Sequence, residues 1–293
     1  MKAIQINNIC LNYGDVSALE EISFEVERGE LFGLIGPDGA GKTSLFRILT
    51  TLLLADSGTA TIDGFDAVRD YKKIRSSVGY MPGRFSLYQD LTVEENLNFF
   101  ATVFGTTVKE NYHLIEDIYK QIEPFKNRRA GKLSGGMKQK LALSCALIHK
   151  PSVLFLDEPT TGVDPVSRKE FWEMLKKLKQ QGITILVSTP YMDEASMCDR
   201  IAFIQNGKIL SINTPEKIIA DFPQKIYAIE TENNYEILKQ LRQNSAVRSV
   251  FSFGDTLHVV FNEDFNIRSE KNNYQLKEIT PTIEDCFMAL LNE

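Results

Sequence analysis

The feature that most constrains the fold of this chain is a glycine-rich segment placed directly after a short apolar run. The run Leu31–Ile35 predicts a buried β-strand, and the apolar pattern over residues 42–54 predicts an α-helix. The segment between them matches G-x-x-x-x-G-K-[ST] and consists of Gly36, Pro37, Asp38, Gly39, Ala40, Gly41, Lys42 and Thr43. This order of strand, glycine-rich turn and helix predicts a phosphate-binding loop.

The residue types in this loop suit a nucleoside triphosphate. Glycines let backbone N–H groups converge on phosphate oxygens without side-chain clashes. The helix that starts near Lys42 directs its positive end at the same anion. We expect Lys42 to reach the outer phosphates and the Thr43 hydroxyl to bind Mg²⁺. Ser44, the next residue, is included in the predicted nucleotide-binding set.

A second apolar run ends in two acids. Residues Val153–Leu156 predict an inner parallel strand, and Asp157 and Glu158 follow it. An acid pair at the end of a buried strand is costly unless something uses it. We expect Asp157 to hold Mg²⁺ through water and Glu158 to orient or polarise an attacking water.

Upstream of this strand lies a glycine-containing helix start. Ser134 is a good helix N-cap, and Gly135 and Gly136 follow it. Taken alone, this pattern indicates only a capped helix. In the sequence it follows the phosphate loop and precedes the acid pair, and this order makes it informative as one of a set of motifs.

Together the motifs resemble the ATP-binding cassette (ABC) transporter ATPases. The family's order and spacing are matched by the phosphate loop, Leu133–Gly136, Leu156–Pro159, and Thr161–Pro165, which resembles the D-loop and contains Asp164. Tyr13 resembles the aromatic residue that stacks on adenine in this family. The resemblance implies an α/β P-loop nucleotide hydrolase cassette with a mixed sheet core, an antiparallel edge sheet and a helical subdomain.

The resemblance also implies a mechanism and partners. In this family two cassettes dimerise head to tail, and each ATP lies between the phosphate loop of one and the signature helix of the other. Ser134, Gly135 and Gly136 would then serve the nucleotide of a second ABC cassette. ATP binding closes the dimer and hydrolysis reopens it, which drives transmembrane permease subunits. Residues Pro281–Phe287 are similar to the ending of bacterial exporter ATPases of the drug-resistance type, which favours export.

Two positions depart from the family. Gly83 stands where Gln is usual, and Pro190 stands where a switch His is usual. Proline has no side-chain donor and no N–H, and His149 fits a helix end better than a replacement. Losing such a group costs about 10²–10⁴-fold in rate. We therefore expect this chain to bind MgATP and hydrolyse it slowly, as the weaker half of a heterodimer or as a slow homodimer.

Composition limits the remaining choices. The net charge of -6 does not resemble the basic surface of a nucleic-acid binder, so no nucleic-acid partner is expected. The four cysteines form no C-x-x-C pair, which favours a reducing compartment. The N-terminus lacks the apolar core of a signal peptide, and no run reaches the ~18 apolar residues of a spanning helix. We expect a cytoplasmic subunit, peripheral to the inner face of the membrane through its partners.

The sequence predicts two domains. Residues 1–222 form the ABC ATP-binding domain, with a helical subdomain at about 88–148, and residues 223–293 form a small α+β domain. Two other functional classes stay open. One is a nucleotide-responsive regulatory cassette that is nearly inactive as a catalyst, and the other is a soluble ABC protein acting on ribosomes or DNA.

Overall fold

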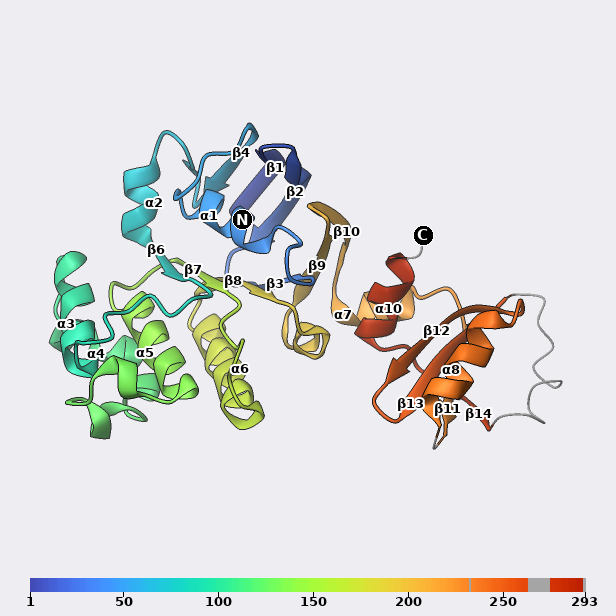
Figure 1. Ribbon diagram of the computed structural model, residues 1–293. Helices are drawn as coiled ribbons and strands as arrows, with labels where there is room; N and C mark the ends of the chain where they lie inside the picture. Colours follow the sequence, from blue (N-terminus) through green and yellow to red (C-terminus); the bar gives the residue numbers. More distant parts are fainter. Residues whose placement is uncertain (232, 263–274, 292–293) are drawn as a thin grey trace. The chain divides into compact units, whose positions relative to one another are not determined.

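The computed structural model describes residues 1–231, 233–262 and 275–291 (Figure 1). The chain divides into two compact units, Met1–Asn213 and Thr214–Glu293. The division falls before helix α7 (Pro215–Ala220), whereas the sequence-based boundary between 222 and 223 lies after it. The structure groups α7 with the second unit because α7 packs on helix α10 (Ile283–Leu290) of that unit.

A six-stranded sheet forms the centre of the first unit, with strand order β10-β9-β3-β8-β7-β6. Strands β9, β3, β8, β7 and β6 are parallel, and β10 is antiparallel to β9. Strands β3, β7 and β8 are buried along their whole length, as expected of inner parallel strands. The strands span Leu31–Ile35 (β3), Val78–Met81 (β6), Val153–Asp157 (β7), Thr184–Thr189 (β8), Arg200–Gln205 (β9) and Lys208–Asn213 (β10).

An antiparallel sheet of order β2-β1-β4-β5 lies above the central sheet (Figure 1). Helix α1 (Lys42–Leu49) packs against strands of both sheets. The helix is shorter than the predicted 42–54 because Thr51 adopts a positive φ of 63° just after it. The remaining elements of this layer are β1 (Lys2–Tyr13), β2 (Val16–Glu27), β4 (Ser57–Ile62), β5 (Phe65–Asp66) and α2 (Tyr71–Ser77).

Helices cover the opposite face of the central sheet and extend into a helical lobe (Figure 1). Helix α6 (Pro165–Gln180) packs on β3 and β8, and α5 (Gly135–Leu147) packs on β6. The lobe is completed by α3 (Val93–Val103) and α4 (Val108–Tyr119). A capping box formed by Thr92 and Glu95 stabilises the start of α3.

The second unit is a four-stranded antiparallel sheet of order β12-β13-β11-β14, with helix α8 on one face. Its strands and helices agree with the small α+β domain that the sequence predicted. In α10, Ile283 and Phe287 are buried, whereas Leu291 lies beyond the end of the helix and is exposed. The elements are α7 and α10, with β11 (Ile226–Glu230), α8 (Asn234–Gln243), β12 (Val247–Phe253), β13 (Thr256–Phe261) and β14 (Leu276–Ile279).

An aromatic pair joins the phosphate-loop helix to the strand of the acid pair. Phe46 on α1 and Phe155 on β7 are both 0% exposed, and their rings meet edge to face with centroids 6.1 Å apart. Because α1 begins with Lys42 and β7 ends with Asp157, this contact sets the spacing between the two motifs.

We predict that Phe155→Ala lowers the free energy of unfolding by about 3–5 kcal/mol, because it leaves a cavity beneath α1. Urea denaturation of the full chain measures the change. Val68→Ala, at a position that is 61% exposed, is the control and should stay within about 0.5 kcal/mol of the parent. Equal effects of the two substitutions would contradict the role of this pair.

Candidate functional site

The phosphate loop is held by its backbone at two crowded glycines. The Gly36 N–H donates to the Thr189 carbonyl at 3.2 Å, and a Cβ on Gly36 would lie 2.1 Å from the Ile204 carbonyl oxygen. Gly41 has a φ of 104°, and a Cβ there would lie 2.5 Å from the Ala18 carbonyl oxygen. Side chains are therefore excluded at both ends of the loop by neighbouring backbone.

The rest of the loop is open on one side. Asp38 and Gly39 are exposed, and Thr43 and Ser44 are half-buried. The Tyr13 hydroxyl lies 3.3 Å from the Ser44 hydroxyl. Tyr13 is the last residue of β1 in the antiparallel sheet, and its side chain thus lies beside the first turn of α1. Pro37 is half-buried and Ala40 is buried, with the Ala40 N–H donating to the Pro37 carbonyl.

Lys42 and Glu158 meet in this site. The Lys42 ammonium donates to the carbonyls of Gly36 and Pro37 at 2.8 and 2.9 Å, and it lies 3.0 Å from Glu158 Oε1. The Lys42 side chain is 2% exposed and that of Glu158 is 21% exposed. A buried ammonium is costly without such partners. The contact joins the phosphate loop directly to the acid pair, two motifs far apart in the sequence.

Strand β8 holds both acids in place. Asp157 is 2% exposed and accepts a hydrogen bond from the Ser188 hydroxyl at 2.8 Å. Glu158 has a positive φ of 49°, and its N–H donates to the Ser188 carbonyl at 3.1 Å. A left-handed conformation is uncommon for a non-glycine residue and is kept where the surroundings determine it.

The donor atoms at this edge fit Mg²⁺. Helix α1 packs against β7, and Lys42 contacts Glu158. Thr43 directly follows Lys42, and Asp157 directly precedes Glu158. A hydroxyl and a carboxylate are oxygen ligands of the kind that Mg²⁺ prefers, with water completing the octahedron.

Both positions that depart from the family pattern lie at the site. A Cβ on Gly83 would be 3.1 Å from the Asp157 carbonyl oxygen and 3.8 Å from Asp157 Oδ2. Pro190 directly follows Thr189, whose carbonyl accepts the Gly36 N–H. A Gln at position 83 or a His at position 190 would therefore extend from backbone that lies next to the acid pair or the phosphate loop.

The signature and D-loop residues lie together but away from this phosphate loop. Ser134 caps α5 by accepting from the Met137 N–H at 3.4 Å, and Asp164 caps α6 by accepting from the Ser167 N–H at 3.0 Å. That backbone hydrogen bond lowers the pKa of Asp164. A Cβ on Gly136 would lie 2.6 Å from the Ser167 hydroxyl, so α5 and α6 approach closely. Figure 1 shows α5 in the helical lobe and α1 beneath the antiparallel sheet.

Sequence reasoning missed several polar residues that support the site. They are Thr160, Arg168, Ser188, Thr189 and Glu194, and they connect the ends of β7 and β8. Glu194 is 3% exposed although Asp193 beside it is exposed. Nothing in the local sequence distinguishes the buried acid from the exposed one.

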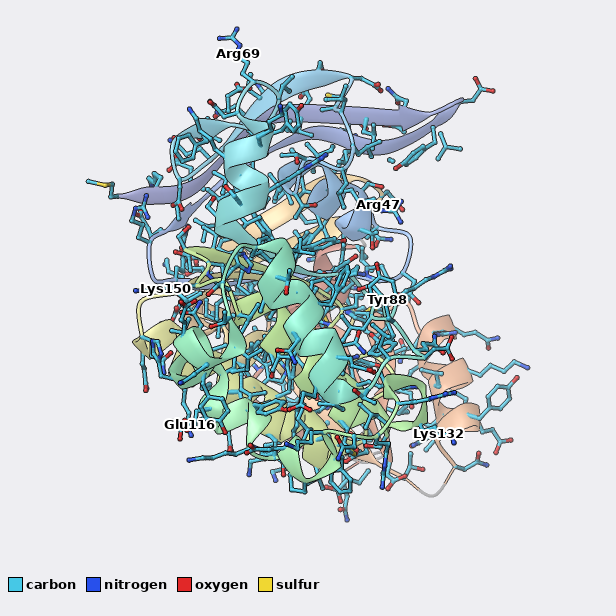
Figure 2. The ribbon with its side chains drawn as sticks, turned by 90° about the vertical axis from the view of Figure 1, so that its left-hand side faces the viewer. Arg47, Arg69, Tyr88, Glu116, Lys132 and Lys150 are labelled. Carbon is cyan, nitrogen blue, oxygen red and sulfur yellow. The ribbon has the colours of Figure 1, made fainter. Side chains whose placement is uncertain are left out.

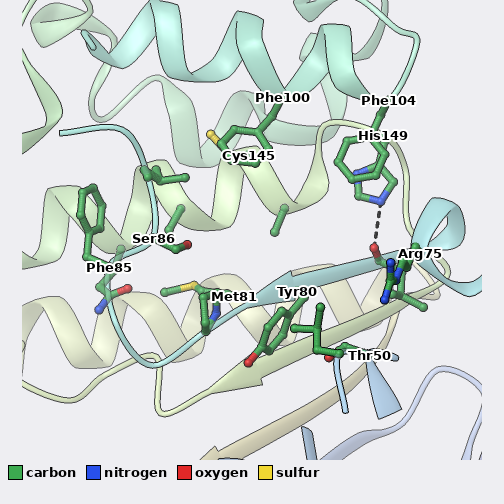
Figure 3. A pocket seen from close by; sticks show the side chains of 17 residues that line it. Thr50, Arg75, Tyr80, Met81, Phe85, Ser86, Phe100, Phe104, Cys145 and His149 are labelled. Carbon is green, nitrogen blue, oxygen red and sulfur yellow. Dashed lines mark hydrogen bonds between the residues drawn. The ribbon is translucent and has the colours of Figure 1, made fainter. Parts of the chain in front are cut away.

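A cavity of about 190 Å³ lies between β6, α3 and α5 (Figure 3). His149 lines it two residues beyond the end of α5, where the sequence predicted a helix-end residue. Its ring stacks on Phe104 with centroids 3.7 Å apart, and its Nε2–H donates to the Val78 carbonyl at 3.0 Å. Figure 2 looks onto this side of the unit, where Tyr88 meets Phe99 of α3 edge to face.

Comparisons with known proteins agree with this geometry. The family model described as ABC transporter matches residues 19–161. The Nod factor export ATP-binding protein I of Rhizobium sp. (strain N33) is 34% identical over 98% of this chain and 96% of its own length. Escherichia coli (strain K12) YbhF, named "Probable multidrug ABC transporter ATP-binding protein", is 38% identical over 94% of this chain and 50% of its own length. This chain therefore spans about half of that relative.

Solved structures show the same fold. The ATP-binding subunit of an ABC transporter is 28% identical, with a TM-score of 0.68 over 75% of this chain and 93% of that one. A bacterial ABC transporter cassette solved as a dimer is 26% identical, with a TM-score of 0.66 over 72% of this chain and 98% of that one. The chain belongs to the ABC transporter family, as the motifs predicted. Within the described residues, no helix combines the length and apolar character needed to cross a membrane.

The burial of His149 leads to a prediction about how the free energy of unfolding depends on pH. Burial lowers its pKa from the ordinary value of 6.5, although the Val78 carbonyl opposes the shift. The unfolded chain then binds more protons below about pH 6.5, so the free energy of unfolding falls as the pH drops through this range. We expect His149→Gln to remove that part of the pH dependence in urea denaturation between about pH 7.5 and 5.5.

The matched control is His113→Gln, because His113 is exposed. This variant should keep the parental dependence on pH. Identical curves for the parent and both variants would show that His149 is not the titrating group.

Proposed function

We propose that this chain is the ATP-hydrolysing, energy-supplying subunit of an ABC exporter. The observation that carries the proposal is the 3.0 Å contact between Lys42 and Glu158 at the carboxyl edge of the sheet. It brings a cation suited to binding phosphate close to an acid suited to orienting water, and phosphoryl transfer to water uses both groups.

Each residue would have a separate task in the reaction. The loop N–H groups and the Lys42 ammonium would bind the phosphates, and Tyr13 would stack on the adenine. Glu158 would orient the attacking water toward the terminal phosphorus. Mg²⁺, held by Thr43 and through water by Asp157, would neutralise charge on the phosphate oxygens.

A second cassette would complete the site. Ser134 and Gly135 are exposed at the start of α5, away from their own phosphate loop. A helix N-terminus offers N–H groups and a positive end to an anion. Presented by a partner cassette, this helix start would contact the terminal phosphate from the side opposite Lys42.

Export through a membrane partner is supported by the names of the relatives. Those names describe Nod factor export and multidrug transport. We propose that permease subunits bind this cassette and hold it at the inner face of the membrane. The cavity beside His149 is a suitable contact for an apolar side chain of such a subunit, since Phe100 and Phe104 line it.

Turnover at this site would be slow. Gly83 and Pro190 lie beside the acid pair and the phosphate loop but carry no group that can hold water or phosphate. The same observation favours the second candidate function, a regulatory cassette that binds nucleotide and barely hydrolyses it. Glu158 is present and held in place, which favours the slow enzyme.

We predict that Pro190→His raises ATP turnover about tenfold or more, because it supplies an orienting imidazole. Phosphate release by the purified chain measures the rate, with Glu158→Gln as the background. Pro190→Ala removes the ring without adding an imidazole and should not raise the rate. A parent that hydrolyses ATP rapidly, with no gain from Pro190→His, would contradict the proposed defect.

A second prediction concerns dimerisation. We expect Glu158→Gln with MgATP to form a dimer in light scattering, because bound ATP is kept between the cassettes. Adding Ser134→Arg should abolish the dimer, since the long side chain blocks the approach to the partner's phosphates. Thr107→Arg is the matched control, because Thr107 is also an exposed helix N-cap in the same lobe. Loss of the dimer in the control as well would contradict a specific role for Ser134.

A further inference from the structure

The segment after strand β8 contains a buried carboxylate that the proposed reaction does not use. Glu194 lies in the short helical turn Met192–Met197 and is 3% exposed. Its neighbour Asp193 has a side chain that is 73% exposed. Burying a carboxylate is costly unless donors surround it, so the partners of Glu194 indicate its purpose.

Two hydroxyl groups donate to Glu194, and one guanidinium forms an ion pair with it. The Thr160 hydroxyl donates to Oε1 at 2.8 Å, and the Thr189 hydroxyl donates to Oε2. The Arg168 guanidinium lies 3.2 Å from Oε1 and supplies the opposite charge. Both oxygens are therefore engaged, and Thr160 and Thr189 are themselves buried.

Each donor belongs to a different functional segment. Thr160 is two residues after Glu158, in the turn that leaves β7. Thr189 is the last residue of β8, and its carbonyl accepts the N–H of Gly36 in the phosphate loop. Arg168 is near the start of α6, the helix that Asp164 caps. One carboxylate thus connects the acid pair, the phosphate loop and the D-loop helix.

The same cluster fixes the backbone around position 190. The Tyr191 N–H donates to the Thr189 hydroxyl at 3.1 Å, and Arg168 lies 4.4 Å from the centre of the Tyr191 ring. Pro190 is held between these two anchored residues. Because Pro190 has no polar side chain, its segment can be aligned with the phosphates only through such neighbours.

We propose that Glu194 is a positioning residue that holds the turn after Glu158 and the segment at position 190 in register with the phosphate loop. This inference rests on the proposed function, because alignment matters only if the site hydrolyses ATP. Small misplacements at such a site cost up to about 10²-fold in rate. The carboxylate would therefore affect the chemical step without touching the nucleotide.

Three variants probe the cluster by degrees. Glu194→Gln keeps one acceptor oxygen and loses the charge, Glu194→Ala loses both oxygens, and Thr189→Val removes one hydroxyl at nearly constant volume. We expect kcat to fall by roughly 10–100-fold in Glu194→Ala and Thr189→Val, with KM changing less than about threefold. Glu194→Gln should lie between the parent and Glu194→Ala.

Matched controls separate positioning from general stability. Thr184 is at the other end of β8, is 1% exposed, and accepts the Gly29 N–H at 3.0 Å. Thr184→Val should lower the melting temperature about as much as Thr189→Val but keep kcat within about twofold. Glu173→Gln, at an exposed position of α6, is the control for Glu194→Gln. Equal losses of kcat in variant and control would overturn the inference.

Amide hydrogen exchange gives a readout that does not depend on turnover. In Glu194→Gln and Thr189→Val we expect faster exchange in residues 36–43 and 158–164, neither of which contains the substitution. Faster exchange confined to residues 189–197 would overturn the positioning role. If the parent does not exceed the Glu158→Gln background, the proposed function fails, and the exchange data still decide whether Glu194 links these segments.

Discussion

The close backbone approach at Gly36 is the constraint on which the rest of the site depends. Any side chain there would collide with the Ile204 carbonyl of β9, and the Gly36 N–H is bound to Thr189 of β8. The chain must therefore turn sharply after β3, between the parallel strands β9 and β8. This directs Lys42 toward the end of β7, where it meets Glu158. Parallel strands end at one edge of a sheet, where the loop after β3 contributes Lys42 and the end of β7 contributes the acid pair.

Much of the first unit could be predicted from its sequence, because its signals are local. The run Leu31–Ile35, the acid pair after Val153–Leu156 and the helix N-cap at Ser134 each reflect one strand or one helix start, and each is present. The extent of the helix after the phosphate loop was predicted less well. Its end depends on the left-handed conformation of Thr51, which apolar periodicity does not reveal.

The supporting polar residues could not be predicted, because their partners are distant in sequence. Ser188 on β8 binds Asp157 on the neighbouring strand β7, and Glu194 binds Thr160 from a different loop. Such contacts depend on which strands lie side by side, and the order β3-β8-β7 follows from no single motif. The importance of positions 83 and 190 could be predicted from the sequence, but their location could not. The family pattern indicated that they matter, and only the fold shows that both lie beside the acid pair and loop.

The tight contact between α5 and α6 has a mechanical consequence. A side chain at position 136 would collide with Ser167, and Lys140 pairs with Glu170 at 2.7 Å one turn further along. The two helices are therefore in contact at two successive turns. Asp164 and Arg168 lie at the start of α6, so a change in the position of α5 would act first on the residues that connect α6 to the strand ends.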